Sequence, residues 1–393
     1  MLSEDNYNIL RLIRSKNVGP HTFFKVIKFF GGLKETIENI EKYNIKTKYK
    51  NKIELAPKEQ IEEEIVACST VGAKIITYKN NNYPKILLSI SDFPPVITAI
   101  GNIELFKKPS VSIVGSRNAS SNGCNFARKI AKELGEKGYI ITSGLATGID
   151  TSSHKAALET GTIAVLGGGI DNIYPRGNED LYYQIKNKGL LVSEVPFGSA
   201  PKAENFPARN RIISGLSKGV VIIEAGERSG TIHTARQAIE QNRELFVAPG
   251  NPYDYRCEGS NKLIKDGANV ITCTEDISDI LENFIVNENY DQKLILNDSF
   301  KNKFNTESND LYEDFDNSIK NNKDEKTIFT EELIENNNLT IKEQIILKIN
   351  HTPVSIDLLE NDLNLSAEEI NSNLIELELE DKIIIDHGDV RIK

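Results

Sequence analysis

Cysteine is scarce in this chain of 393 residues, and its few copies form no recognisable pattern. The four cysteines, Cys68, Cys124, Cys257 and Cys273, lie far apart, no CxxC pair occurs, and the histidines do not complete a metal-ligand spacing. Disulfide frameworks and zinc sites depend on closely spaced ligands of these types. The sequence therefore argues against both and predicts partly buried thiols that are not cross-linked.

Long hydrophobic runs are also missing. The apolar stretches, such as 111–114 and 219–223, are short, whereas a helix that crosses a bilayer needs about 20 apolar residues. The N-terminus shows no basic-then-apolar leader. We therefore expect a cytoplasmic protein without membrane contact, and its length allows two or three domains.

Positive charge is in deficit, with 47 lysines and arginines against 57 aspartates and glutamates and a net charge of −10. This balance argues against nucleic acid as a partner, because phosphate binding needs local positive charge. The acidic excess, however, is concentrated at about 287–335 and in the C-terminal tail, while the middle of the chain carries most of the arginines. The net charge therefore weakens a nucleic-acid hypothesis without excluding it.

Residues 1–70 read as a small helical domain. Apolar residues such as Leu10, Ile13, Phe23 and Val26 recur at helical spacing. The glycine-proline turn between them, within 16–22, suits a helix-hairpin-helix, in which the turn and the next helix start can meet a phosphate. A helical pair with a glycine turn is also a common structural unit, so both interpretations remain open.

Residues 71–285 alternate short apolar strands with amphipathic helices. Strands are expected at 111–114, 139–142, 163–166, 190–192, 220–223 and 245–247, and helices at 125–137, 151–159, 178–188 and 231–241. Strands that are apolar on both faces and alternate with helices are typical of a parallel sheet covered on both sides. The fold class is therefore α/β, with a Rossmann-like doubly wound parallel sheet.

Residues 286–335 form an acidic, polar stretch that predicts a flexible linker. In 336–393, helices are expected at 341–349, 355–363 and about 367–378, followed by a hairpin of 383–385 with 390–392. This pattern predicts a winged-helix domain. Its recognition helix carries glutamates and no arginine, which favours contact with protein over contact with DNA.

Five loops at the expected strand ends contain residues that suit an anion. Ligands of open parallel sheets bind beyond the carboxyl ends of the strands. Glycines expose backbone N–H groups there, serines and threonines add hydroxyls, and arginines add a guanidinium fork. The loops are 115–117, 143–150, 167–169 with 174–178, 206–211, and 224–231.

The fourth loop, 206–211, is open to two interpretations. Phe206 beside Arg209 and Arg211 suits a single nucleic-acid strand, because an aromatic ring stacks on an unpaired base for about 1–3 kcal/mol while guanidiniums meet the backbone. Alternatively, Phe206 belongs to the core, and Arg209 or Arg211 pairs with Glu194 or Glu224.

Other polar residues of the loops have structural alternatives as well. Asp150 is placed as a helix N-cap, where it can organise the loop or touch a ligand. His154 and His233 each lie at a helix start and are expected to be structural. No GxGxxG follows the first strand and no GxxxxGK[ST] occurs, so neither a dinucleotide nor a P-loop nucleotide is indicated, and no cofactor is expected.

Taken together, the motifs VGSR at 114–117, SGLATGID at 143–150, AVLGGG at 164–169, FPARNR at 206–211 and SGT at 229–231 resemble the DNA-processing protein A (DprA/Smf) family over about 83–273. The resemblance implies a bacterial cytoplasmic protein that binds and protects single-stranded DNA in natural transformation and recombination, forms homodimers, helps load the RecA recombinase, and is not an enzyme. The DNA-binding residues that the loops and this resemblance imply are Gly115, Ser116, Arg117, Ser143, Gly144, Gly148, Gly167, Gly169, Arg176, Phe206, Arg209, Asn210, Arg211, Ser229, Gly230 and Thr231.

The chain departs from that family pattern at a few positions. Thr147 stands where the family often has an arginine, Ser153 replaces a usual alanine, and His233 replaces a usual aliphatic residue. The change at Thr147 leaves out one candidate phosphate contact, and the change at Ser153 is expected to be harmless. His233 lies near the proposed DNA-binding loops, where it is expected to alter local contacts.

Two other functions compete with this one. The scaffold also looks like nucleoside-monophosphate phosphoribohydrolases, but the glutamate of their glycine-rich motif is missing after Gly230-Thr231. The acidic recognition helix of the winged-helix domain alternatively suggests an adaptor that contacts proteins and for which DNA is incidental.

Overall fold

A computed structural model describes residues 2–47 and 52–282, and further along the chain 341–342, 345–346, 354–355, 363, 367–380, 382–386 and 389–392. The chain divides into two compact units, Met1–Phe300 and Lys301–Lys393, which are taken in turn. Among the described residues, no helix combines the length and apolarity needed to cross a membrane. The expected linker at 286–335 lies outside the described residues.

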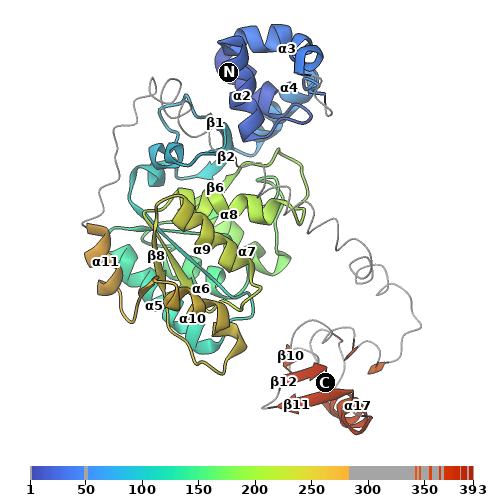
Figure 1. Ribbon diagram of the computed structural model, residues 1–393, viewed down its shortest axis with the longest axis vertical. Coiled ribbons are helices and arrows are strands. Elements are labelled where there is room, and N and C mark those ends of the chain that lie inside the picture. The colour runs from blue at the N-terminus through green and yellow to red at the C-terminus, as the bar shows by residue number, and fades with distance from the viewer. Residues whose placement is uncertain are drawn as a thin grey trace. The chain divides into compact units, whose positions relative to one another are not determined.

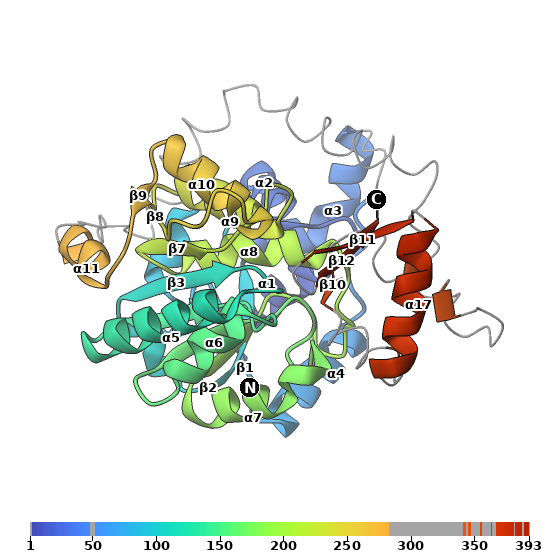
Figure 2. The ribbon, with the colours of Figure 1, turned by 90° about the horizontal axis from the view of Figure 1, so that it is seen from below.

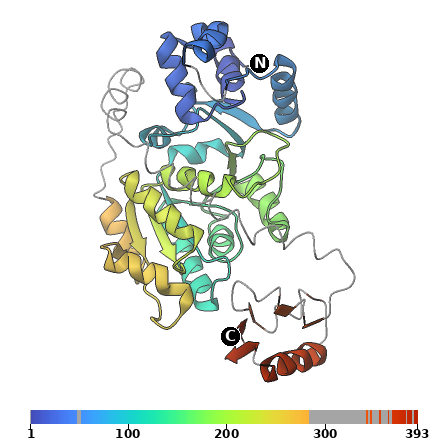
Figure 3. The same ribbon diagram turned by 45° about the vertical axis from the view of Figure 1, so that its right-hand side comes forward.

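Four helices begin the first unit: α1 (Glu4–Ile13), α2 (Pro20–Phe30), α3 (Leu33–Thr47) and α4 (Lys58–Thr70). Pro20 starts α2, where a missing N–H costs nothing, and Gly31 ends it in a left-handed conformation with φ of 80°. Their apolar faces meet around Leu10, Phe23 and Tyr43. The prediction of a helical N-terminal domain is confirmed, and these helices lie beside the β1–β2 edge of the central sheet (Figures 1 and 3).

The central sheet has nine strands in the described part of the chain, in the order β1-β2-β6-β5-β4-β3-β7-β8-β9. Their bounds are β1 (Lys74–Thr77), β2 (Val96–Gly101), β3 (Ser110–Gly115), β4 (Ile140–Ser143), β5 (Thr162–Val165), β6 (Leu190–Ser193), β7 (Gly219–Ile223), β8 (Glu244–Val247) and β9 (Asn269–Val270). From β6 to β9 all neighbours are parallel, as predicted. The expectation of a purely parallel sheet is wrong at one edge, where β2 runs antiparallel to β6 and β1 antiparallel to β2.

Helices cover both faces of this sheet (Figure 2). One face carries α5 (Ser121–Glu136), α6 (Ile149–Ala156), α7 (Glu179–Lys188) and α11 (Glu275–Glu282), and the other carries α8 (Asn205–Gly215), α9 (Gly230–Glu240) and α10 (Glu258–Lys265). Short 3-10 helices lie at η1 (Lys85–Ser89), η2 (Ile103–Lys107), η3 (Arg176–Asn178) and η4 (Tyr255–Cys257). The chain is therefore doubly wound about β3, and the strand order reverses between β3 and β7, where such sheets bind ligands.

Buried serines hold α8 against β3. Ser110 Oγ donates to the carbonyl oxygen of Leu216 at 2.7 Å, and Ser112 Oγ donates to that of Ile213 at 2.9 Å. The orphan carbonyls of a helix end need such donors when they are buried. Polar residues at alternate positions of an otherwise apolar strand thus fix the C-terminal end of α8, whose N-terminal end reaches the strand-end loops.

The second unit contains β10 (Val354–Ser355), α17 (Ala367–Leu379), β11 (Ile383–Asp386) and β12 (Asp389–Ile392). The three strands form an antiparallel sheet in the order β10-β12-β11, and α17 packs on it through Ile370, Leu374 and Leu377. The predicted third helix and terminal hairpin are confirmed. Of the helix expected at 355–363, residues 356–362 lie outside the described residues. Ser355 itself is not helical, because Val354–Ser355 pairs with β12 as a strand.

Candidate nucleic-acid interface

Three of the five predicted anion loops meet at the end of β3. The Ser116 N–H donates to the carbonyl oxygen of Glu224 at 2.7 Å, which joins the first loop to the fifth. The Thr231 hydroxyl donates to the carbonyl oxygen of Gly115 at 3.1 Å, and the Ile149 N–H donates to that of Ser116 at 3.3 Å. Residues from β3, α6 and α9 are therefore held around the segment that presents Arg117.

Arg117 and Phe206 lie against each other at this edge. The exposed Arg117 places its guanidinium carbon 5.6 Å from the centre of the Phe206 ring, which is half-buried. The Tyr174 ring lies 5.4 Å from the same ring and is 46% exposed. A Cβ on Gly167 would lie 3.0 Å from the Phe206 ring, so the glycine lets this ring approach the end of β5. The result is an aromatic surface with a cation beside it.

Tyr174 was not among the residues predicted from the sequence. It belongs to the third loop, between the glycine run and the exposed Arg176. An aromatic residue in a polar loop that also carries an arginine was the available signal.

The interpretation of 206–211 as a loop is wrong, because these residues form the first turns of α8. Arg209, only 7% exposed, donates from Nη1 to the carbonyl oxygens of Gly144, at 2.6 Å, and Val165. Burial lowers the pKa of Arg209 to about 10. A Cβ on Gly144 would lie 2.7 Å from the guanidinium carbon, so any other residue there would displace the Arg209 guanidinium. Arg209 thus joins α8 to the ends of β4 and β5.

Arg211 is also engaged inside the protein. Its guanidinium is 2.6 Å from Glu194 and 3.2 Å from Asp92, and the residue is 7% exposed. The two carboxylates raise the pKa of Arg211 against the opposing effect of burial. Pairing of Arg211 with Glu194 was the structural alternative for this segment. Asn210, between the two arginines, is half-buried. Because Arg209 and Arg211 are both buried, the exposed cations of this edge come from other segments.

Asp150 organises the second loop from within. The N-cap of α6 is Gly148, with φ of 76°, and not Asp150 as expected from the sequence. The Asp150 carboxylate, which is buried, accepts hydrogen bonds from Gly144 N–H at 3.0 Å and Ala146 N–H at 3.3 Å. Burial raises its pKa, although Arg209 and these N–H groups oppose that shift. Of its two alternative roles, loop organisation is the one that the geometry supports.

His154 is a structural residue, as predicted. Its Nε2 accepts a hydrogen bond from Leu145 N–H at 3.3 Å, and its Nδ1 lies 2.7 Å from the Thr162 hydroxyl. Complete burial, assisted by Arg209, lowers the pKa of His154 to about 3. The imidazole is therefore neutral at physiological pH and connects the loop to β5.

The departures from the family pattern lie at different depths. Thr147 is exposed, and its hydroxyl donates to the carbonyl oxygen of Arg117 at 3.2 Å. Ser153 is buried and donates to Ile149 at 2.9 Å, so its hydroxyl is satisfied. His233 is half-buried in the first turn of α9. Thr147 therefore stands directly beside Arg117, where a second cation would have joined it.

A carboxylate of the protein itself fills the helix start that follows β3. Glu224, at the end of β7, accepts hydrogen bonds from the Ser120 N–H at 2.8 Å and from the Ser120 hydroxyl. The start of this helix is where doubly wound folds commonly hold a phosphate. The Asp150 carboxylate similarly accepts hydrogen bonds from N–H groups of the second loop. Neither place offers these donors to an external phosphate.

The third and fifth loops are open by contrast. A Cβ built on Gly177 or on Gly230 would have no atom within 4 Å. Gly177 follows Arg176, and Gly230 begins α9 behind its N-cap Ser229, whose hydroxyl accepts from Thr231 N–H at 3.2 Å. Backbone N–H groups at a helix start attract anions. These two loops and Arg117 remain as the exposed positions for phosphate.

Several other candidates serve the packing of the loops. Ser143 is buried and donates to the carbonyl oxygen of Ile113 at 2.7 Å. A Cβ on Gly148 would lie 2.3 Å from the carbonyl oxygen of Ser116, and one on Gly169 would lie 2.7 Å from that of Pro196. These residues shape the edge, and contact between them and a ligand stays a prediction.

The four cysteines differ in burial. Cys68 and Cys257 are buried, Cys124 and Cys273 are half-buried, and none of the four is joined to another. Within the described residues, no cluster of three or more histidine, cysteine, aspartate or glutamate side chains could hold a metal ion.

Three stretches of the chain match family models. Residues 3–67 match a DprA-like N-terminal HHH domain, residues 74–282 match DNA recombination-mediator protein A, and residues 340–389 match a DprA winged helix domain. The last match confirms the predicted winged-helix class of the C-terminal domain.

Curated relatives agree. The DNA processing protein DprA of Bacillus subtilis is 41% identical over 232 residues, which are 58% of this chain and 77% of the relative. The Smf protein of Synechocystis is 43% identical over 204 residues, which are 50% of this chain and 51% of the relative, so the match spans about half of that protein.

Solved structures give the same result. DprA from Streptococcus pneumoniae superposes with a TM-score of 0.53 at 32% identity, over 68% of this chain and 99% of that one. DNA processing protein A from Helicobacter pylori, whose structure is described as giving insights into a unique single-stranded DNA binding mode, has a TM-score of 0.50 at 30% identity, over 55% of this chain and 99% of that one. Since the central family model covers more than half of the sequence, the chain belongs to the DNA recombination-mediator protein A (DprA/Smf) family.

Proposed function

We propose that this chain binds and protects single-stranded DNA at the edge formed by the strand-end loops, without catalysing a reaction. The observation that carries the proposal is the exposed Arg117 guanidinium lying 5.6 Å from the half-buried Phe206 ring. An aromatic ring can stack only on an unpaired base, and a neighbouring guanidinium can hold the phosphate beside it. The relative from Helicobacter pylori, described as a single-stranded DNA binder, supports the same ligand.

The backbone of the strand is proposed to follow the open anion positions. These are Arg117, Arg176 and the start of α9 at Gly230, which together offer guanidinium groups and N–H groups. Because the net charge is −10, general attraction cannot hold a polyanion, and binding depends on these local donors. Arg209 and Arg211 are assigned to holding α8, and thereby Phe206, in place.

The wider role follows from family membership. Description of the family as recombination mediators supports the proposal that the chain hands its strand to the RecA recombinase during recombination or natural transformation, as a homodimer in the cytoplasm. A phosphoribohydrolase activity remains the alternative. The missing glutamate after Gly230-Thr231 argues against it, and release of base from a panel of nucleoside monophosphates would establish it.

Titration of labelled oligo-dT by fluorescence anisotropy tests the binding site. We expect Arg117→Ala to weaken binding about tenfold at moderate salt. The slope of log affinity against log salt should shrink by about 0.7 for each phosphate that the variant no longer binds. Arg176→Ala should behave alike, while Arg209→Ala should lower affinity and stability together, because its guanidinium is buried between α8 and the sheet.

Lys132→Ala is the matched control, since it removes an exposed charge about 17 Å along α5 from the first residue of that helix. It should leave both affinity and salt slope unchanged. Wild-type binding by Arg117→Ala and Arg176→Ala at every salt concentration would refute the proposed edge. RecA assembly on a strand covered by a single-strand binding protein tests the mediator role, which Arg117→Ala should impair.

A further inference from the structure

A separate cavity of about 390 Å³ opens beyond the carboxyl ends of β7, β8 and β9, beside the start of α5. Its volume lies within the range of sites for small molecules, about 300–1,000 Å³. It adjoins the point where the strand order reverses between β3 and β7, at which doubly wound sheets bind ligands. It does not include Arg117, Phe206 or Arg176.

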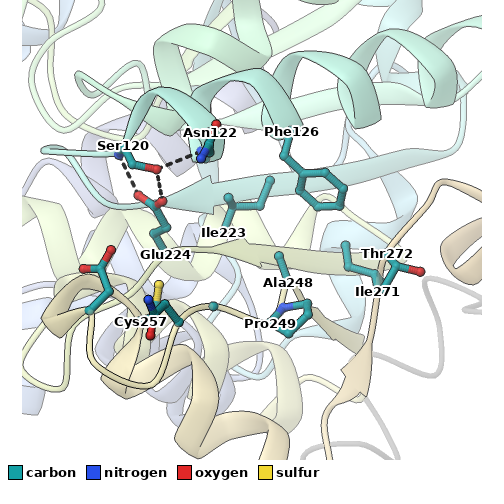
Figure 4. A pocket seen from close by; sticks show the side chains of 14 residues that line it. Ser120, Asn122, Phe126, Ile223, Glu224, Ala248, Pro249, Cys257, Ile271 and Thr272 are labelled. Carbon is teal, nitrogen blue, oxygen red and sulfur yellow. Dashed lines mark hydrogen bonds between the residues drawn. The ribbon is translucent and has the colours of Figure 1, made fainter.

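The two ends of this cavity differ in character (Figure 4). At one end, Glu224 is hydrogen-bonded to Ser120, with Cys257 nearby, and at the other Phe126 and Ile271 form an apolar wall. The thiol of Cys257 adds no charge, because burial raises its pKa to about 11. A ligand in this cavity would therefore meet an aromatic and aliphatic wall on its face and a carboxylate at its edge.

The carboxylate at the polar end is fixed in place and has acceptor capacity left. Each oxygen of Glu224 accepts one hydrogen bond from Ser120, whereas an ionised carboxylate offers about four lone-pair sites. A Cβ on Gly123 would lie 2.6 Å from the carboxyl carbon, so glycine at that position allows the carboxylate to rest against α5. Two acceptor sites thus remain for the N–H donors of a ligand.

The charge of the lining excludes phosphate. No lysine or arginine lines the cavity, whereas Glu224 and Asp254 both do. The nearby guanidinium of Arg256 is bound to Asp254, with Nη2 2.9 Å from Oδ2. A suitable ligand is therefore flat, uncharged and rich in N–H donors along one edge.

We propose that this cavity binds a nucleobase that carries an exocyclic amine, with the amine donating to Glu224 and the ring lying against Phe126. Cytosine, adenine and guanine each present such an amine, whereas thymine has a single ring N–H flanked by two carbonyl oxygens that the carboxylate would repel. The base can belong to the bound strand or to a small nucleoside. Ser120 is only three residues from Arg117, at most about 11 Å along the chain, so a strand held at Arg117 can reach the cavity.

The strand version of this inference rests on the proposed function, and the experiment keeps the two apart. One arm measures binding of deoxycytidine, deoxyadenosine and thymidine to the full chain by calorimetry. The other compares oligo-dT with the same oligonucleotide carrying one central dC. Affinity for plain oligo-dT reports the edge at Arg117, and the preference for amine-bearing bases reports the cavity.

The variants remove either the carboxylate or the space. Glu224→Gln keeps the shape but loses the charge, and Ala248→Leu fills the cavity from its lining without touching Glu224. The matched control is Glu227→Gln, which removes the same charge from an exposed side chain in the same loop. Ala248→Leu keeps the test valid if Glu224→Gln disturbs the hydrogen bonds to Ser120.

We expect wild type and Glu227→Gln to prefer deoxycytidine over thymidine about tenfold, the size of one hydrogen bond to a charged group. Both cavity variants should abolish that preference, and Arg117→Ala should lower oligo-dT affinity without abolishing it. A preference seen only in the oligonucleotide arm supports the cavity with the strand as the source of the base. Absence of any preference in both arms, or a preference that survives in Ala248→Leu, would overturn the proposal.

Discussion

The buried ion pair between Arg14 and Glu64 allows a sharp test of how the N-terminal helices are held. Arg14, just after α1, reaches Glu64 in α4, with Nη2 2.9 Å from Oε1 and Nε 3.1 Å from both carboxylate oxygens. Their side chains are 4% and 6% exposed. Arg14 Nη1 also donates to the carbonyl oxygen of Glu194 at 3.1 Å, beyond β6. The pair therefore ties two helices to the central sheet.

Glu64→Gln removes the charge and leaves the Arg14 guanidinium buried beside a neutral amide. Loss of one partner of a buried pair costs about 3–5 kcal/mol, because the remaining charge is uncompensated. The amide oxygen still accepts one hydrogen bond, so we expect a value near about 3 kcal/mol. Glu54→Gln is the control: Glu54 pairs with Lys16 at 3.2 Å, but both side chains are about two-thirds exposed, and such pairs contribute at most about 1 kcal/mol.

Urea unfolding of the full chain, combined with hydrogen exchange, measures both effects. Exchange should accelerate in α1 and α4, and also in α8, because Glu194 binds Arg211 in that helix. Equal loss of stability in Glu64→Gln and Glu54→Gln, or a loss below about 1 kcal/mol in the former, would refute the reasoning. Unchanged exchange in α8 would show that loss of the Arg14–Glu64 pair does not extend through Glu194 to Arg211.

Two further predictions concern the second loop. Burial lowers the pKa of His154 to about 3 in the folded chain, from about 6.5 in the unfolded chain. Between pH 6.5 and pH 3, His154 is therefore protonated in the unfolded chain but not in the folded one. The contribution of His154 to the free energy of unfolding is complete above pH 6.5 and falls by about 1.4 kcal/mol per pH unit below it. Asp150, whose pKa burial raises, acts in the opposite direction. His154→Gln should flatten this loss in acid unfolding curves, and an unchanged slope would contradict it. Gly148→Ala should lower both stability and oligo-dT affinity, because its φ is 76° and its Cβ would lie 2.3 Å from the Ser116 carbonyl oxygen; a melting temperature equal to wild type would contradict this.

Much of the sheet could be predicted because its strands are largely apolar. The strands at 111–114 and 220–223 lie within one residue of the observed β3 and β7. The apolar pattern could not reveal the direction of the strands at the β1–β2 edge. β1 and β2 are about as apolar as the parallel strands, but they pair antiparallel. Helix α8 escaped prediction because its buried arginines, Arg209 and Arg211, break the apolar periodicity that identifies a helix.

The candidate site was harder to predict than the fold. Glycines in strand-end loops suggest close approach by a ligand, yet Gly144, Gly148 and Gly169 make room for atoms of the protein itself. A sequence shows that a position needs glycine but not what approaches it. The same holds for Arg209, whose hydrogen bonds to carbonyl oxygens at the ends of β4 and β5 depend on segments distant in sequence.

The internal carboxylates explain how an acidic chain can still direct a polyanion to one place. Asp150 and Glu224 occupy the N–H groups that doubly wound folds commonly offer to phosphate after the first two strands of the parallel series. A phosphate approaching those loops meets negative charge, whereas at Arg117, Arg176 and the start of α9 it meets donors without such competition. Under the proposed function, the same carboxylates that disfavour a nucleotide cofactor would keep the strand on the side of Phe206, where its bases can stack.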